Sequence, residues 1–283
     1  MIGKVAVVVD SAAYLPQSII DRHGLFVAPL SVELDGRQYL EGVDITADEF
    51  YQRLATARSV STSQPAVGRF IELYRQAAEA GAKEIVSIHI GSSISGTVQS
   101  AQVASESSSL PVTIVDTRQA SFAEGLCVWE ALEALADGKT VVDAAELVAV
   151  ASQQVGNTFV VKALDLARRG GRLAPGEEAP PGISVLALTG GGMKVVGTAS
   201  TLEEATDAMA EQVLAAAQEA GDRRLRVGVG HGAAPEMAAD LRARIAEMKR
   251  VDEIIDYVVG PAVGAHTGAG TAGAVFLARP VVI

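Results

Sequence analysis

Cysteine, aromatic residues and basic residues are all scarce in this sequence, and each scarcity excludes a class of protein. A single cysteine, Cys127, rules out an internal disulfide, and its position beside Trp129 in an apolar helical run predicts a core residue. Lysine and arginine number 23 against 34 aspartates and glutamates, for a formal net charge of −11. This balance argues against a nucleic-acid-binding or anionic-membrane-binding surface, which would need a clustered basic face.

Long hydrophobic runs are also missing. No stretch approaches the roughly 20 apolar residues of a membrane span, and the first ten residues lead directly into a strand instead of a cleavable signal. We therefore expect a cytoplasmic protein. The four histidines, His23, His89, His231 and His266, share no metal-ligand spacing, so we expect no metal site.

Strands and helices alternate through the first half of the chain. Strands of the buried type, such as Val5 to Val9 and Val112 to Val115, are each followed by a polar turn and a helical pattern. This rhythm predicts a parallel sheet with helices on both faces, a Rossmann-like α/β/α domain of three layers over residues 1–152. Ligands of such sheets bind outside the carboxyl ends of the strands.

The order of elements changes near residue 153. Several strands now follow one another or alternate irregularly with helices, which predicts an α+β domain with a mixed sheet over residues 153–283. Three local predictions complete the assignment. Phe26 to Leu34 is expected to be one strand, Ser59 to Ala66 a polar loop, and Gly260 to Gly270 a glycine-rich loop.

The stretch from Glu84 to Ser100 is the most informative part of the sequence. An apolar β-branched run ends at Gly91, and hydroxyl side chains follow before a helix begins near Thr97. Ser92, Ser93 and Ser95 stand where the first helical turn has unpaired N–H groups, so the turn could bind an anionic or oxygen-rich group. An ordinary helix cap with a solvated turn is the alternative interpretation.

Two patterns in the sequence resemble enzymatic or nucleotide-binding motifs. Gly228 to Ala233 fits a loose dinucleotide-binding pattern, but the following strand does not end in an acid. Ser93 lies in a G-S-S-I-S sequence that fails the nucleophile-elbow pattern at its last position. A Ser/His acyl hydrolase using Ser95 or Ser93 with His266 stays open as an alternative, since His266 and Arg172 lie in glycine-flanked turns that could project into a cleft.

Six short motifs, in order along nearly the whole chain, resemble those of DegV family proteins. They are Asp10-Ser11 with Leu15-Pro16, Thr62 to Pro65, Ser92 to Thr97 with Ser100-Ala101, Asp116-Thr117 with Ser121 and Gly125, Arg169 to Arg172, and Gly260-Pro261 through His266 to Gly273. Each motif is weak alone, but their shared order makes the resemblance specific.

The resemblance implies a bacterial fatty-acid-binding protein with a ligand tunnel between its two domains. Such a protein is a carrier without catalytic residues or cofactor, and a separate kinase phosphorylates the carboxyl group of its long-chain fatty acid to an acyl phosphate. Matched by motif, the binding residues are Thr62 and Ser95 on the carboxyl group, Ser63, Ser93 and the backbone near Gly96 beside it, and Arg172 and His266 from the second domain.

The sequence departs from the family pattern in two places. Lys162 stands where the family often has aspartate, and Gly182-Ile183-Ser184 replaces a usual Lys-Pro pair, near the acidic Gly176-Glu177-Glu178. These departures bear on kinase docking and lid geometry. They leave the carboxyl-binding motifs intact.

Overall fold

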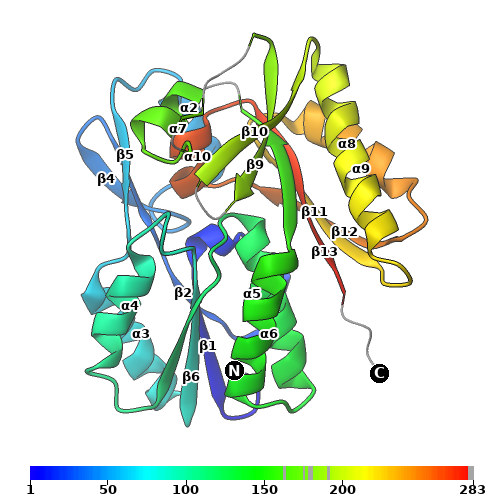
Figure 1. Cartoon of the computed structure of the whole chain (residues 1–283). Helices are drawn as coiled ribbons and strands as arrows, with labels where there is room; N and C mark the ends of the chain where they lie inside the picture. The colour runs from blue at the N-terminus through cyan, green and yellow to red at the C-terminus, as the bar shows by residue number, and fades with distance from the viewer. Residues whose placement is uncertain (162–163, 175, 178–180, 190–191, 280–283) are drawn as a thin grey trace.

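Two larger sheets of different construction form the two halves of this protein (Figure 1). The computed structural model describes residues 1–161, 164–174, 176–177, 181–189 and 192–279. Within those ranges no helix is both long enough and apolar enough to cross a membrane.

The first sheet is parallel and has the strand order β2-β1-β6-β7. Its strands are β1 (Val5–Asp10), β2 (Phe26–Ala28), β6 (Glu84–His89) and β7 (Val112–Asp116). The accompanying helices are the 3₁₀ turn η1 (Ser11–Ala13), α1 (Gln17–His23), α3 (Val67–Glu79), α4 (Thr97–Ser105), α5 (Phe122–Ala136) and α6 (Val141–Gln154). Helices α3 and α4 pack on one face and α5 and α6 on the other, which confirms the predicted α/β/α layers.

The second sheet is mixed, also as predicted, and has the order β10-β9-β8-β13-β11-β12. Only β11 and β12 run parallel; the other neighbours are antiparallel. Its strands are β8 (Gly156–Val160), β9 (Ile183–Thr189), β10 (Gly192–Ala199), β11 (Leu225–Gly232), β12 (Val251–Val258) and β13 (Thr271–Ala278). Helices α8 (Leu202–Glu219) and α9 (Pro235–Ala246) cover one face, and α7 (Leu164–Arg169) and α10 (Pro261–Thr267) lie at one end. The division of the chain at residues 152 and 153 stays a prediction.

A third, three-stranded sheet corrects two of the local predictions. It consists of β4 (Arg37–Leu40), β3 (Ser31–Leu34) and β5 (Val60–Ser63), beside helix α2 (Ala47–Leu54). The single strand expected over Phe26 to Leu34 is wrong, because Pro29 lacks an N–H and the chain leaves the first sheet there to enter the third. The loop expected over Ser59 to Ala66 is wrong as well, since residues 60–63 pair with β3.

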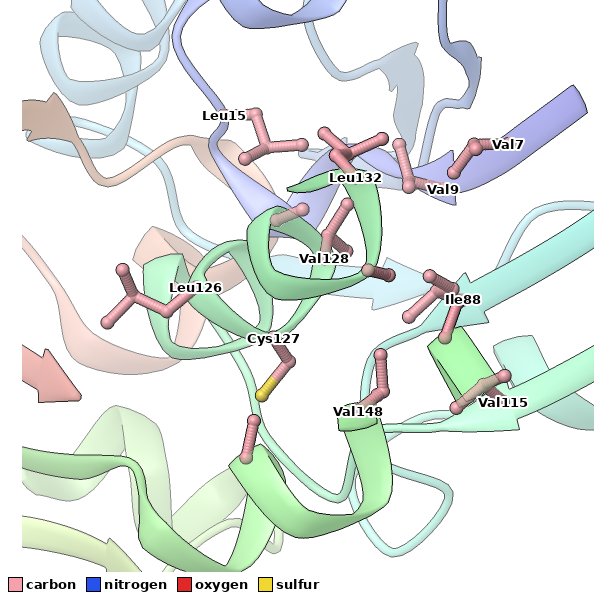
Figure 2. Close-up of a cluster of buried hydrophobic side chains, with 14 of the residues drawn as sticks. Val7, Val9, Leu15, Ile88, Val115, Leu126, Cys127, Val128, Leu132 and Val148 are labelled. Atoms are coloured by element: carbon pink, nitrogen blue, oxygen red, sulfur yellow. The ribbon is translucent and has the colours of Figure 1, made fainter. Parts of the chain in front are cut away.

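The main hydrophobic core lies between the first sheet and helices α5 and α6 (Figure 2). Leu126, Cys127 and Leu132 of α5 are fully buried there against strand residues such as Ile88. Val275 and Leu277 of β13 belong to the same cluster, so the second sheet shares this core. The predicted core position of Cys127 is confirmed.

Glycines on β11 make the close contact between the two halves possible. A Cβ atom at Gly228 would lie 2.2 Å from the ring of Phe122, and one at Gly230 would lie 2.1 Å from the ring of Tyr257. At Gly232 the same atom would lie 2.1 Å from the hydroxyl of Tyr51. The pattern that resembled a dinucleotide loop is thus a strand whose missing side chains make room for aromatic rings.

Candidate functional site

A cavity of about 410 Å³ lies between the two halves of the molecule. Its walls include the loop after β6, the strand β5 and the start of α10, and all six strands of the second sheet contribute. Its size lies within the usual range for small-molecule pockets. The cavity is therefore the candidate binding site.

The serine-rich loop between β6 and α4 forms one wall of the cavity. Asp116 fixes its start by accepting hydrogen bonds from the backbone N–H of Ser92 at 3.1 Å and from its hydroxyl at 2.6 Å. At the other end the Ser95 hydroxyl lies 2.8 Å from that of Thr97. Helix α4 begins after Gly96, and no side chain within the described part of the chain caps it. Its first N–H groups are thus available to an anionic group.

Thr62 faces this loop from the edge strand β5. Its Oγ1 lies 2.9 Å from Nε2 of His266 on α10. Ser63, the next residue along the strand, is exposed, and its hydroxyl accepts a weak hydrogen bond from the Gln38 amide at 3.5 Å. Alternation along β5 therefore turns Thr62, and not its neighbours, toward α10.

Arg172 brings a positive charge to the same place from the second half of the molecule. The chain leaves α7 at Arg169, and Gly171 adopts a φ of +70°, so the backbone can reverse there. The guanidinium group donates to the carbonyl of Ile94 at 3.0 Å and also contacts the carbonyl of Gly170. Partial burial lowers the pKa of Arg172 from its usual range. With five N–H donors in all, the guanidinium retains capacity to bind a carboxylate.

His266 is neutral at physiological pH. Burial, followed by the nearby charge of Arg172, lowers the pKa of its imidazole to about 4. A Cβ atom at residue 170 would lie 2.4 Å from Nδ1 of His266, so the close approach of α7 requires Gly170. A neutral imidazole can exchange hydrogen bonds with Thr62 and with a ligand without carrying a charge into the cavity.

The helix that carries His266 corrects the third local prediction. The glycine-rich loop expected over Gly260 to Gly270 is wrong, because Pro261 begins helix α10 with its preset φ. The buried carboxylate of Glu41 accepts hydrogen bonds from the N–H of Ala262 at 2.9 Å, from the Tyr14 hydroxyl at 3.1 Å and from the Ser11 hydroxyl. Burial raises the pKa of Glu41 despite these bonds. Sequence reasoning missed Glu41, since a lone acid after a short, half-polar strand gives no signal.

The remaining walls of the cavity are largely apolar. They include Leu30 and Ile90 from the first half and Phe159, Leu188, Met193 and Val263 from the second. These residues were not predicted, because each belongs to an ordinary apolar pattern in its own strand or helix. Only the packing of the two halves shows that they face a common space.

All seven residues named from the sequence line this one cavity. They are Thr62, Ser63, Ser93, Ser95, Gly96, Arg172 and His266. Their roles toward a ligand stay predictions. Of the departures from the family pattern, Lys162 and Glu178 lie outside the described residues, whereas Ser184 is buried in β9.

The contacts at the site give no support to the hydrolase alternative. The imidazole of His266 bonds to Thr62, and no carboxylate among the described residues orients it. The carboxylates of Asp116 and Asp256 bond to Ser92 and Arg242, not to His266. In the described ranges, no three His, Cys, Asp or Glu side chains are grouped so that they could hold a metal ion together.

Comparison with known proteins places the chain among close relatives. Residues 4–279 match the model of a family described as "Uncharacterised protein, DegV family". A DegV domain-containing protein of Streptomyces coelicolor is 37% identical, and the alignment covers 99% of this chain and 100% of that protein.

Solved structures show the same fold. A DegV family protein from Thermus thermophilus, described by its fatty acid binding, superposes with a TM-score of 0.90 at 30% identity, covering 98% of this chain and 100% of the other. DegV from Bacillus subtilis, described as a fatty acid binding protein, gives a TM-score of 0.88 at 25% identity, covering 98% of this chain and 99% of the other.

Proposed function

The chain belongs to the DegV family, and from this premise we propose that it is a carrier of long-chain fatty acids. The acyl chain occupies the cavity between the two halves, and the carboxyl group lies among the polar residues at its end. A separate kinase then phosphorylates the bound carboxyl group. The carrier needs no cofactor of its own and works in the cytoplasm.

One observation carries this proposal: the polar residues from both halves converge on a cavity whose other walls are mainly apolar. Burial of a methylene group is favourable by about 0.8 kcal/mol, so a long acyl chain contributes roughly 10 kcal/mol before the costs of binding. A few polar contacts are then enough to orient the head group. The relatives from Thermus thermophilus and Bacillus subtilis, described as fatty acid binding, support the same ligand class.

The contacts at the polar end suit a carboxylate. The hydroxyls of Thr62 and Ser95 donate to its oxygens, and the uncapped N–H groups after Gly96 face the same charge. Ser63 and Ser93 lie beside this end of the cavity. Arg172 offsets the negative charge from the opposite side.

The kinase step follows from the position of the head group. Ser63 and Ser93 are exposed, so the polar end lies near the surface and a partner protein can reach it. An oxygen of the carboxylate forms a bond to the γ-phosphorus of a nucleoside triphosphate held by the kinase. The bond from that phosphorus to its bridging oxygen breaks, and the nucleoside diphosphate leaves. Arg172 suits the charge that the acyl phosphate acquires.

Mass spectrometry of the purified protein tests the proposal. Extraction under denaturing conditions should release a long-chain fatty acid in near-stoichiometric amount. Refolding of the stripped protein followed by titration with palmitate should restore one ligand per chain. Recovery of a nucleotide or a metal in that amount, without lipid, would contradict the proposal.

A further inference from the structure

Tyr257 separates the fatty-acid cavity from a second cavity in the molecule. The second cavity, of about 600 Å³, lies beside η1 and α9 and is lined by residues such as Leu15, Pro16 and Ala238. Among the described residues, Tyr257 is the one that lines both cavities. Its side chain therefore stands between them.

The tyrosine lies on the edge strand of the second sheet opposite to the one beside Arg172. Arg172 is bonded to β10, where the N–H of Met193 donates to its carbonyl at 2.9 Å, and β10 is one edge strand of the second sheet. Tyr257 lies on β12, the opposite edge strand. Its ring stacks on that of Tyr14, whose hydroxyl accepts a hydrogen bond from the N–H of Val263 at 3.2 Å, so the ring lies near α10. An acyl chain that leaves the polar end across the second sheet toward β12 meets the Tyr257 ring where the two cavities adjoin.

The ring is held in place from three sides. It lies over Gly230 of the neighbouring strand, where a Cβ atom would come within 2.1 Å of Cζ. Phe122 stacks on it with ring centroids 5.0 Å apart, and Tyr14 stacks at 6.4 Å. A ring packed in this way cannot swing aside easily to admit a longer ligand.

We propose that Tyr257 limits the length of the acyl chain by closing the fatty-acid cavity against the second cavity. The inference rests on the proposed function, because it concerns the same ligand in the same site. It identifies a specificity-determining residue on the wall that the two cavities share. Removal of the ring would join the two cavities and provide room for additional methylene groups.

Competition binding with saturated fatty acids of increasing length, from myristate through palmitate and stearate to arachidate and behenate, tests this role. The wild type should lose affinity beyond a definite length. We compare the shortest acid beyond that length with palmitate. In Tyr257→Ala the affinity for this acid, divided by the affinity for palmitate, should rise roughly tenfold, since two further methylene groups become buried. Tyr257→Phe keeps the ring and should keep the wild-type limit.

Val258→Ala is the matched control. Val258 is the next residue of β12 and lines the second cavity but not the fatty-acid cavity. Its truncation should therefore leave the length limit unchanged. Circular dichroism and thermal melts establish that each variant is folded. If Tyr257→Ala does not fold, Tyr257→Leu, which removes less volume, should show a smaller shift in the same direction.

The outcomes separate this inference from the proposed function. Palmitate binding by the wild type tests the function, whereas the ratio between the longer acids and palmitate tests the role of Tyr257. An unchanged ratio in folded Tyr257→Ala or Tyr257→Leu would overturn the inference while the carrier function stands. An equal rise in this ratio in Tyr257→Phe would also overturn the inference, since the ring itself would then not set the length limit.

Discussion

Thr62 and His266 are joined by a contact of 2.9 Å between Oγ1 and Nε2, although 204 positions separate them in the sequence. The pair connects the small sheet of the first half to helix α10 of the second. It also lies at the polar end of the cavity, beside Arg172. The same two side chains therefore join the halves and line the cavity.

Replacement of Thr62 by valine should weaken fatty-acid binding and leave the fold intact, because it removes a hydroxyl at almost constant volume. The lost hydrogen bond costs about 1 kcal/mol, or roughly a fivefold increase in Kd, and Ser95→Ala in the same chain should increase the effect. Titration of the stripped protein with palmitate measures both changes. Ser61→Ala is the control, since Ser61 is exposed on the same strand and does not line the cavity. An unchanged Kd in the double variant would show that the carboxyl group binds elsewhere.

Protonation of His266 should destabilise the ligand-free protein in acid. Its folded pKa of about 4 lies below the unfolded value of 6.5, so the unfolded chain binds more protons between these pH values. Stability contributed by the neutral imidazole is complete above pH 6.5 and is lost as the pH falls toward 4. Allowing for partial exposure, the loss should be about 2 kcal/mol.

Urea unfolding of the wild type and His266→Gln at neutral pH and near pH 4.5 measures this effect. The variant cannot titrate at residue 266, so its stability should fall less over the same interval. Parallel pH dependence of the two proteins would contradict the lowered pKa of His266.

Loss of the Arg172 guanidinium should affect phosphoryl transfer more than fatty-acid binding. In Arg172→Ala the carboxyl group keeps the contacts from Thr62 and the α4 N–H groups, but the charge that stabilises the acyl phosphate is gone. Acyl phosphate formed with a purified fatty acid kinase can be trapped with hydroxylamine and counted. His266→Ala should act in the same direction.

Arg169→Ala is the control for this experiment, since Arg169 ends α7 in an exposed position three residues away. The stripped variants without kinase should not hydrolyse a p-nitrophenyl ester. Rapid ester turnover by the wild type alone, lost in Ser95→Ala, would contradict the carrier function and restore the hydrolase alternative.

Arg226→Met should destabilise the protein strongly without a direct effect on the ligand. Arg226 is 2% exposed and bonds at once to Glu130 and Glu133 of α5 and to Glu253 of β12, with its guanidinium over the Trp129 ring. The substitution leaves buried Glu130 without its cation, a loss of about 3–5 kcal/mol in urea unfolding. Arg242→Met breaks the exposed pair with Asp256 and should cost less than about 1 kcal/mol. Equal losses in the two variants would contradict this assignment.

Much of the fold could be predicted from local patterns in the sequence. The apolar runs that became β1, β6 and β7 predicted the parallel sheet. Local sequence patterns gave the wrong secondary structure where the polarity of a segment differs from what its strand or helix usually shows. Residues 61–63 are hydroxylated and alternate ones are exposed, so only the pairing with β3 shows that residues 60–63 form a strand.

The site was predicted in part, and only its polar end. Motifs in order identified Thr62, Ser95, Arg172 and His266, whose hydroxyl, guanidinium and imidazole groups stand out in a sequence. The apolar walls could not be predicted, because a leucine that lines a cavity and a leucine buried in a core occur in the same patterns of apolar residues. Nor could Glu41 and Tyr257, whose roles depend on contacts between the two halves.

The glycines of β11 have a consequence for how this molecule can be recombined with its relatives. Gly228, Gly230 and Gly232 leave three hollows on the second sheet, and the rings of Phe122 and Tyr257 and the hydroxyl of Tyr51 occupy them. Two of these occupants, Phe122 and Tyr51, come from the first half of the chain. A chimera that takes its two halves from different parents must therefore keep a glycine opposite Phe122 and another opposite Tyr51. A parent with an alanine at position 228 or 232 cannot donate its second half alone, whereas the contact between Gly230 and Tyr257 travels within the second half.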